Sequence, residues 1–503
     1  MITKGNFMAV LLTELLNSVR CEIRGAAKGK NIDKIEYNSR LADGGTLFFC
    51  MPGARADGHN FAPQAYDLGC RAFVVERILA LPPDAVQIVV SNSREALAHI
   101  SAKFYGNPAD QMTVIGITGT KGKTTTAILI EEMLNSCGIG CGYIGTNGVV
   151  IGENRYDTIN STPESRELHK YFRIMLDRGY THVVMEVSSQ ALDHYRVAGI
   201  KFNTVIYTNF SEDHIGEGEH ATLEEYRNAK HKLFTDYSVT NVIYNVDDPT
   251  AEFMISGTSG RLISYGIDNE ADFRGCDMRP FRAETSLGID FDLLRNGIKT
   301  GIRLRTPGSF SVYNGLAAIA AVNCCGISVR EAADALRNIS IKGRFEIVDA
   351  IPGITFIIDY AHNGLSLTRA LTVLREYSPK RLICVFGSVG GRTYVRRREL
   401  AEAAAHLADF TVITSDNPDN ENPDDIIKDI LNYFDRTKLY TTITDREEAV
   451  RFAVRIANEG DIVLFAGKGH EDYQLIDGKR VPLNERKIIL DEAEKIMSQA
   501  VLK

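Results

Sequence analysis

Apolar and polar residues alternate along this chain of 503 residues in a pattern typical of mixed α/β proteins. From 1 to 107, short apolar runs such as TLFFCMPG and RAFVVE are separated by Gly and Pro, which predicts a small α/β domain. From 108 to 342, runs such as HVVMEV and NVIYNV are apolar on both faces, as in a parallel sheet that helices cover on both sides. Within this domain, 261–312 alternates polar and apolar residues and predicts antiparallel strands.

The last part of the chain, from 343 to 503, repeats the cycle of strand and helix. Apolar runs such as ITFIIDYA and DIVLFAGKG alternate with helical segments such as SLTRALTVLREY, which indicates a doubly wound, Rossmann-like unit. The predicted fold class is therefore α/β in three domains: 1–107, 108–342 and 343–503. The length agrees, because a single core rarely serves more than about 250–300 residues.

The segment 112–126, MTVIGITGTKGKTTT, is an apolar strand that leads through a Gly-rich turn into a helix. Gly119 and Gly122 allow the backbone to pass close to anionic oxygens, and the N–H groups at the helix start attract such oxygens. Lys123 can reach the β- and γ-phosphates of a nucleotide, and Thr124 is placed to hold Mg²⁺. The segment therefore predicts a binding site for ATP and Mg²⁺ in a central P-loop ATPase domain.

The spacing differs from the common Walker pattern, which would place glycine where Ile117 stands. The match is to a shorter form, T-G-T-x-G-K-T-T. The amphipathic run 125–137, which stops at Gly138, supplies the helix that such a loop requires. A Gly-rich turn with a purely structural role is the alternative.

Composition narrows the class of protein. A net charge of −8 and a pI near 5.8 argue against binding nucleic acid through a broad basic surface. No apolar window reaches the ~18 residues that cross a bilayer, and no signal peptide is evident, so we expect a cytoplasmic protein without a membrane span. The nine cysteines are scattered and never spaced as C-x-x-C, which argues against a disulfide framework or a zinc site.

Three further residues are candidates for the ATP site. Glu186 ends the run HVVMEV, and the carboxyl ends of parallel strands face the ligand crevice. His214 follows the strand end TNFSED, and Lys230 lies on the helical segment YRNAKHKLF. Each has an ordinary alternative as a solvent-exposed residue at a strand end, in a loop or on a helix.

Together these motifs resemble those of the Mur ligase family of ATP-dependent enzymes that form peptide bonds. The segments that carry the resemblance span nearly the whole chain: 118–125, 185–189, 208–214, 229–230 and 359–363. The members that add the third residue of the muramyl peptide are also similar at 38–40, 52–61, 161–164 and 467–471. The resemblance implies a monomer that joins an amino acid to a UDP-MurNAc dipeptide, in peptidoglycan synthesis.

The resemblance implies residues for ATP and two Mg²⁺ ions. Thr124 and Glu186 would hold one ion, and His214 and Lys230 the other. A lysine ammonium cannot ligate Mg²⁺; in the family this lysine is carbamylated by CO₂, which supplies an anionic oxygen of the kind Mg²⁺ prefers. The catalytic residues would be Lys123, Lys230, His214, Glu186 and Arg344. The ATP-binding residues would be Thr118, Gly119, Thr120, Lys121, Gly122, Lys123, Thr124, Thr125, Asn314, Arg344, Asp359 and His362.

The nucleotide-sugar substrate has its own implied residues. Ser39, Gly53 and Arg55 would receive uridine. The muramyl-peptide side would meet Ser161, Thr162, Ser188, His194 and Arg196. Arg196 is a natural counter-charge for a phosphate or a carboxylate. His194 stands where some relatives have glutamine, and a plain surface histidine is the alternative.

The third domain is expected to choose the amino acid, through Arg392, Asp416, Asn417, Asp419, Gly467 and Glu471. Members that add meso-diaminopimelate have D-N-P-R, whose arginine pairs with the distal carboxylate, whereas 416–419 reads D-N-P-D. An aspartate would repel that carboxylate and tolerate an ammonium. We therefore expect L-lysine or L-ornithine, with meso-diaminopimelate as the alternative; a simply solvated acidic loop is also open.

Other functions remain open at this point. A ligase of the folylpolyglutamate type lacks a uridine-binding domain before the P-loop, whereas residues 1–107 precede it here. A P-loop motor or switch would leave the metal and substrate segments unexplained, and it would hydrolyse ATP without an acceptor. A degenerate paralogue with a regulatory role is a further alternative.

Overall fold

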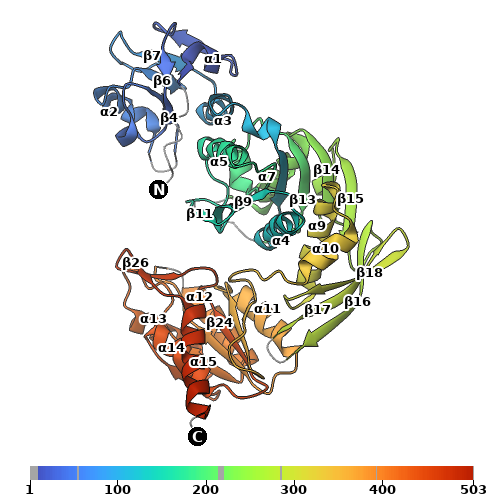
Figure 1. Ribbon diagram of the computed structural model, residues 1–503. Helices are drawn as coiled ribbons and strands as arrows, with labels where there is room; N and C mark the ends of the chain where they lie inside the picture. Colours follow the sequence, from blue (N-terminus) through green and yellow to red (C-terminus); the bar gives the residue numbers. More distant parts are fainter. Residues whose placement is uncertain (1–8, 54–55, 213–219, 284–285, 392–393, 502–503) are drawn as a thin grey trace. The chain divides into compact units, whose positions relative to one another are not determined.

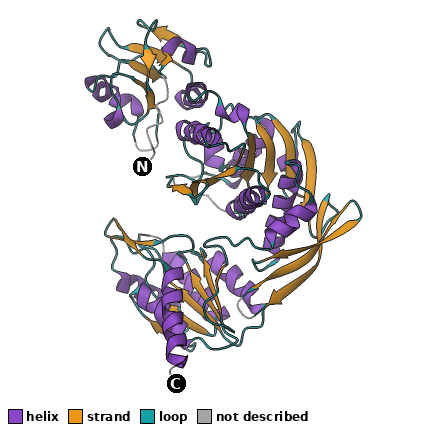
Figure 2. Ribbon diagram, viewed as in Figure 1, coloured by secondary structure: helices purple, strands orange, loops and turns teal. Residues whose placement is uncertain are grey.

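The computed structural model describes residues 9–53, 56–212, 220–283, 286–391 and 394–501. The chain forms two compact units, one of Met1–Phe273 with Ala317–Ser328, the other of Arg274–Leu316 with Val329–Lys503. Helix α9 (Ser309–Cys324) is divided between them. Figure 1 labels the elements, and Figure 2 shows that both units contain helices and strands.

The first unit begins with a five-stranded sheet. Its order is β2 (Glu22–Arg24), β7 (Val86–Val89), β6 (Ala72–Val75), β5 (Thr46–Phe49) and β4 (Lys34–Glu36), parallel except for β2. Alternate residues of β5 enter two cores, Leu47 on one face and Phe48 on the other, which explains its continuous apolar run. The other elements here are α1 (Leu12–Leu16), α2 (Ala62–Asp67), α3 (Ser93–Phe104), and the ribbon of β1 (Val10–Leu11) and β3 (Asn31–Ile32).

The larger sheet of the first unit holds the P-loop. Its parallel strands, in order, are β9 (Cys141–Gly145), β12 (His182–Glu186), β8 (Thr113–Thr118), β13 (Phe202–Tyr207), β14 (Val239–Asn245) and β15 (Arg261–Gly266). Antiparallel β10 (Gly148–Ile151) and β11 (Asn154–Tyr156) extend it beyond β9. The helices are α4 (Lys123–Ser136), α5 (Ser165–Asp177), α6 (Ser189–Asp193), α7 (Leu223–Thr235) and α8 (Ala251–Ile255). Phe172 of α5 and Leu233 of α7 share one core with Val183 and Val205 of the sheet.

Two parts of the predicted antiparallel segment 261–312 are wrong. Residues 309–312 belong to helix α9. Residues 261–266 form β15, which pairs with β14 in parallel register. The antiparallel strands begin later, with β16 (Phe273–Arg282), β17 (Leu287–Arg295) and β18 (Ile298–Leu304). Alternating polarity marks a half-exposed strand of either direction, so it cannot distinguish the last parallel strand from the antiparallel strands that follow it in the same sheet.

The second unit is a doubly wound sheet. Its order is β19 (Glu346–Val348), β20 (Thr355–Asp359), β24 (Ile462–Ala466), β21 (Leu382–Phe386), β22 (Phe410–Ile413) and β23 (Tyr440–Thr442), parallel except for β19. Helices α11 (Gly364–Arg375), α12 (Tyr394–Leu407) and α13 (Pro423–Tyr433) contribute to one core, and α14 (Arg446–Ile456) and α15 (Glu485–Val501) to another. Alternate residues of β21 enter these two cores, Cys384 one and Ile383 the other. Helix α10 (Val329–Leu336) and the hairpin of β25 (Tyr473–Ile476) and β26 (Lys479–Pro482) complete the unit.

Candidate active site

The Gly-rich turn lies between β8 and α4, as the sequence predicts. Gly119 and Gly122 have φ angles of 143° and 87°. A Cβ at Gly119 would lie 1.9 Å from Thr208 Oγ1. The close approach of these two segments therefore requires glycine at position 119. Lys123 begins α4, and its Nζ donates to the carbonyl oxygens of Gly119 at 2.9 Å and Thr120 at 3.0 Å. The backbone therefore has the strand–turn–helix form that binds phosphate at a helix start.

The end of β13 braces this turn. Thr208 Oγ1 donates to the carbonyl of Lys121 at 2.7 Å, and the Lys121 N–H donates to Asn209 Oδ1 at 2.9 Å. The Thr120 N–H donates to the Asn209 carbonyl at 2.8 Å. These hydrogen bonds fix the turn to the segment that follows β13. The local sequence of the turn could not show them, because their partners lie about 90 residues later in the chain. Thr118 Oγ1 is buried and has no hydrogen-bond partner among the described residues.

Lys230 lies on α7 and points to the same turn. Its side chain is 1% exposed, and its Nζ donates to the Gly119 carbonyl at 3.0 Å. The ammonium also lies 4.3 Å from the centre of the Tyr226 ring. Lys123 and Lys230 therefore meet at one carbonyl, and Lys230 is not the exposed helix residue of the alternative interpretation.

Glu186 ends β12 beside the P-loop strand, where it pairs with Ile117. The carboxylate is fully buried and accepts hydrogen bonds from Tyr143 Oη at 2.8 Å, the Thr146 N–H at 2.9 Å and Thr146 Oγ1 at 3.1 Å. Because a carboxylate has about four acceptor positions, these bonds leave room for a metal ion. Thr124, at the start of α4, is also buried. The two residues are of the oxygen-donor type that Mg²⁺ prefers, so the site fits the ion.

A cavity of about 150 Å³ brings several predicted residues together. Lys123 and Lys230 lie in its wall with three residues predicted to hold the muramyl peptide, Ser161, Ser188 and Arg196. Asn160, Ser189 and Gln190 complete the lining. Polar and cationic groups thus surround a space next to the Gly-rich turn, as an anionic substrate requires.

Arg196 lies in the wall of this cavity, and Thr162 contacts it. Thr162 Oγ1 donates to the Glu186 carbonyl at 2.8 Å and accepts from the Ser188 N–H at 3.1 Å. Arg196 donates to the Thr162 carbonyl at 3.2 Å and to Glu164 Oε1 at 3.0 Å. The Arg196 guanidinium is thus held in place by a fixed carboxylate, which orients it toward the cavity. His194 is exposed at the end of α6 and does not line the cavity.

Two of the predicted nucleotide residues of the second unit, Asp359 and His362, lie at the end of β20 and in the loop that follows it. Asp359 accepts hydrogen bonds from the Phe345 and Ala361 N–H groups, each at 2.8 Å. Burial raises the pKa of Asp359, while the Arg344 guanidinium and the N–H donors act against this. Arg344 lies 4.9 Å from the Tyr360 ring centre, and His362 Nδ1 lies 2.8 Å from the Tyr360 carbonyl oxygen. Asn314 is buried on α9.

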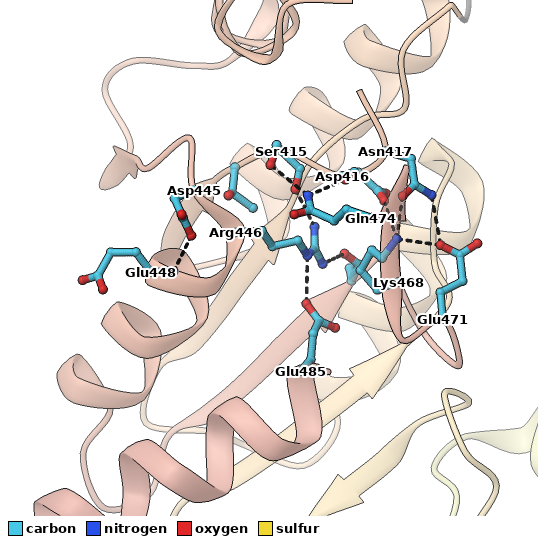
Figure 3. A network of polar contacts seen from close by, with 12 residues as sticks. Ser415, Asp416, Asn417, Asp445, Arg446, Glu448, Lys468, Glu471, Gln474 and Glu485 are labelled. Atoms are coloured by element: carbon cyan, nitrogen blue, oxygen red, sulfur yellow. Dashed lines mark hydrogen bonds and ion pairs between the residues drawn. The ribbon is translucent and has the colours of Figure 1, made fainter. Parts of the chain in front are cut away.

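The predicted amino-acid residues form a compact polar network in the second unit (Figure 3). Lys468 Nζ donates to Asn417 Oδ1 at 2.7 Å and to Glu471 Oε2 at 2.6 Å, and it lies 3.7 Å from Asp416 Oδ1. Asn417 Nδ2 donates to Glu471 Oε2 at 3.0 Å. Gly467 has a φ of 110°, and a Cβ there would lie 2.6 Å from Asp416 Oδ2. The loops after β22 and β24 therefore bring these residues into contact.

Arg446, the first residue of α14, joins the two loops of this network (Figure 3). It donates to the carbonyl oxygens of Ser415 at 3.1 Å and Ala466 at 2.8 Å, and to Glu485 Oε1 at 2.8 Å. The side chains of Arg446 and Glu485 are both buried. The ends of strands β22 and β24 are thus held by one guanidinium.

Asp419 occupies a different position from the rest of the network. Its φ is 51°, and its Oδ1 accepts a hydrogen bond from the Gly478 N–H at 2.9 Å. It also lines a cavity of about 660 Å³, which is bounded by the loop after β22, the start of α14 and the β25–β26 hairpin. Its carboxylate is therefore engaged with the hairpin.

The remaining predicted residues divide into two groups. Ser39 is buried, with Oγ 2.7 Å from Gln64 Oε1, and the Gly53 N–H donates to the Ala56 carbonyl at 3.1 Å. Neither lies in the cavities above. Three predicted residues lie outside the described part of the chain: Arg55, His214 and Arg392.

Sequence reasoning missed several residues at these sites, among them Lys468 and Ser189. Lys468 lies inside a motif that was recognised, yet its role as the centre of the network depends on the loop after β22. Ser189 follows a recognised serine; it lines the first cavity, and its Oγ lies 2.8 Å from His220 Nε2. Proximity to a motif is the only signal the sequence contains for either residue.

Comparisons with known proteins agree along the whole chain. Three family models match: Mur ligase family, catalytic domain, over residues 31–105; Mur ligase middle domain, over 117–322; and Mur ligase, glutamate ligase domain, over 343–469. The UDP-N-acetylmuramoyl-L-alanyl-D-glutamate–2,6-diaminopimelate ligase of Clostridium botulinum is 38% identical over 473 residues, which are 93% of this chain and 96% of the relative. The enzyme of the same name from Geobacillus thermodenitrificans is 40% identical over 474 residues, 92% of this chain and 95% of the relative.

Solved structures give the same result. A structure titled as a UDP-N-acetylmuramoyl-L-alanyl-D-glutamate–2,6-diaminopimelate ligase superposes with a TM-score of 0.73 at 28% identity and covers 97% of this chain and 100% of its own. The MurF ligase of Thermotoga maritima in complex with ADP superposes with a TM-score of 0.60 at 17% identity, covering 93% and 98%, and shares the fold.

The P-loop, the oxygen donors beside it and these matches define an ATP-dependent, ADP-forming amide ligase with a three-domain α/β organisation. The chain belongs to the Mur ligase family, whose members act in peptidoglycan synthesis. The predicted family, fold class and enzyme class are thereby confirmed. The expected preference for lysine or ornithine is not supported, because the similar relatives are named as diaminopimelate ligases. No helix in the described ranges combines the length and apolarity needed to cross a bilayer.

Proposed function

We propose that this enzyme joins 2,6-diaminopimelate to UDP-N-acetylmuramoyl-L-alanyl-D-glutamate at the expense of ATP. The names of relatives that are similar over more than nine-tenths of the chain support this choice of substrates. It replaces the expectation of lysine, which rested mainly on the charge of Asp419. The carboxylate of Asp419 accepts a hydrogen bond from the Gly478 N–H.

The observation that carries the proposal is the cavity beside the Gly-rich turn. Lys123 and Lys230 come from two helices and meet Arg196 and several hydroxyl groups around one space. A reaction between a phosphate and a carboxylate brings two anions together, so the site must supply positive charge from several directions. The cavity has this character.

The proposal gives roles to residues of the cavity wall and to other predicted residues. Lys123 and the backbone of 118–125 bind the phosphates of ATP, and Arg196 orients the terminal carboxylate of the peptide. Thr124 and Glu186 would hold Mg²⁺, which would neutralise charge on the phosphates. Lys230, as its carbamate, and His214 would hold a second ion. Asn314, Arg344, Asp359 and His362 bind the nucleoside and its phosphates.

The reaction follows from the chemistry of a carboxylate. It resists attack by an amine because it is already anionic. Its oxygen therefore first attacks the γ-phosphorus of ATP, which releases ADP and leaves an acyl phosphate. The amine then attacks the acyl carbon, and inorganic phosphate leaves as the amide forms. Lys123 and Arg196 contribute by position and charge, so no nucleophilic Ser or Cys is needed.

The ends of the two substrates have separate sites. Ser39, Gly53 and Arg55 would bind uridine, and Ser161, Thr162, Ser188 and His194 the muramyl peptide. The amino acid would meet Asp416, Asn417, Gly467, Glu471 and Arg392. Lys468 belongs with this group, because it links Asn417 to Glu471.

Phosphate release with a panel of amino acids tests the proposal. With UDP-MurNAc-L-Ala-D-Glu and ATP present, meso-diaminopimelate should give the highest kcat/KM, with lysine and ornithine lower by about tenfold or more, as for a substrate whose charged group lacks its partner. Phosphate release that needs neither acceptor nor amino acid would contradict ligation. A higher kcat/KM for lysine would contradict the choice of diaminopimelate alone.

A further inference from the structure

Asp419 is joined to the β25–β26 hairpin by three hydrogen bonds. Its N–H donates to the Leu475 carbonyl, and its own carbonyl accepts from the Asp477 N–H, both at 2.9 Å. The third bond runs from the Gly478 N–H to Asp419 Oδ1, also at 2.9 Å. Asp419 thus behaves as one residue of a further strand beside β25, with its side chain reaching the turn.

The geometry of the turn explains why a carboxylate is useful there. Asp477 and Gly478 connect the two strands and both have positive φ, 48° and 70°. This is the two-residue turn that suits the right-handed twist of a hairpin. The N–H of the second turn residue has no partner within such a hairpin, so an acceptor from outside stabilises it. Asp419 supplies that acceptor, whereas the arginine of D-N-P-R relatives has only donors.

The hairpin in turn positions the predicted amino-acid site. The Leu475 N–H donates to Asn417 Oδ1 at 2.9 Å, the same oxygen that accepts from Lys468. Gln474 Nε2 donates to the Asp416 carbonyl at 2.6 Å (Figure 3). A shift of β25 along the loop would therefore rotate the Asn417 amide away from Glu471.

We propose that Asp419 is a positioning residue: it fixes the hairpin at its turn, and through Leu475 it fixes Asn417 and Glu471 for binding the amino acid. Its negative charge does not select the side chain of that amino acid. The inference rests on the proposed function for the identity of the substrate. It explains how an aspartate at this position is compatible with a substrate that ends in a carboxylate.

Three variants distinguish the effect of the Asp419 hydrogen bond from the effect of its negative charge. Asp419→Asn removes the charge but keeps the accepting oxygen, and asparagine tolerates positive φ. Asp419→Gly removes the acceptor without strain at this φ. Asp477→Asn is the matched control, because it removes a charge from the same turn while the backbone bond to Asp419 remains.

Steady-state kinetics should show a split between KM and kcat. Asp419→Gly should raise KM for the amino acid about tenfold, the effect of one lost hydrogen bond, with kcat and KM for ATP unchanged. Asp419→Asn and Asp477→Asn should leave all three constants within about twofold. Specificity is the ratio of kcat/KM for diaminopimelate to kcat/KM for lysine. A tenfold change of this ratio in Asp419→Asn would overturn the proposal, as would an unchanged KM for the amino acid in Asp419→Gly.

Hydrogen exchange gives a test that does not depend on the substrate. The Gly478 amide should exchange faster in Asp419→Gly than in the wild type and in Asp419→Asn. Equal exchange in all three would overturn the positioning role. If the wild type accepts no amino acid, the proposed function fails, and the exchange of Gly478 still decides whether Asp419 fixes the hairpin.

Discussion

Lys230 Nζ lies 3.0 Å from the Gly119 carbonyl oxygen, which also accepts a hydrogen bond from Lys123 at 2.9 Å. The two lysines come from α7 and α4, so this carbonyl joins a helix far along the chain to the phosphate-binding turn. A displacement of either side chain into the cavity would place its charge on a bound anion. The functional importance of both lysines can be tested separately.

Replacement of Lys123 should remove activity without unfolding the protein. Lys123→Ala is expected to lower kcat for phosphate release by about 10²–10³-fold or more, because it deletes a charge from the phosphate site. Its half-buried position at the start of α4 predicts little change in Tm. Glu132→Ala, exposed on the same helix, is the control and should be active. A fully active Lys123→Ala would remove the P-loop assignment.

Replacement of Lys230 should be rescued by small acids. Lys230→Ala is expected to be inactive, and short carboxylic acids such as acetate should restore part of kcat, because they can replace the anionic oxygens of a carbamate. Lys232→Ala on the same helix removes an ion pair with Asp193 at 2.7 Å and should stay active. Rescue is measured as phosphate release against acid concentration. Unimpaired activity of Lys230→Ala would exclude a role at the metal.

Loss of the buried Arg446 should destabilise the second unit. Arg446→Met leaves Glu485 buried without its partner, which typically costs about 3–5 kcal/mol, measured as the free energy of unfolding in urea. The double variant Arg446→Met with Glu485→Gln should recover part of this loss, since no charge then remains uncompensated. Arg398→Met breaks an exposed pair with Glu402 and should have no measurable effect. Equal free energies of unfolding of Arg446→Met and wild type would contradict the conclusion that Arg446 holds the loops after β22 and β24 together.

The buried Glu131 should make stability depend on pH. Burial, with a smaller effect of Glu132, raises the pKa of Glu131 from an ordinary 4.5 to about 8. Between these two values the folded chain binds more protons at this site than the unfolded chain, so this contribution to stability is present below pH 4.5 and is lost as pH rises to about 8.

Glu131→Gln tests this dependence, because the amide resembles the protonated acid and can still accept the hydrogen bond from Asn135. Its gain in Tm over wild type should grow from pH 4.5 to 8 and then level off. Glu132→Gln, exposed at the next position, should give no such trend. A gain that is independent of pH would show that Glu131 is ionised throughout.

The Gly-rich turn, which we propose binds phosphate, could be predicted from sequence because its parts are contiguous. Gly119, Gly122 and Lys123 lie within one strand–turn–helix, whose form follows from local residue preferences. Glu186 could be placed by the rule that parallel strands end at one edge of the sheet, and its pairing with Ile117 confirms that placement. The amino acid could not be predicted from Asp419, because the partner of that carboxylate lies in a hairpin 59 residues later.

The residue types along the chain by themselves determined the α/β class, the strand–turn–helix of the Gly-rich segment and the strand ends that carry candidate side chains, since each depends on neighbouring residues. Only the tertiary structure decided that Lys230 is buried against Gly119, that Lys468 joins Asn417 to Glu471, and that Asp419 braces a turn. These contacts depend on how strands and loops that are distant in the chain align. That alignment is set by the packing of whole sheets and is not encoded in any local pattern.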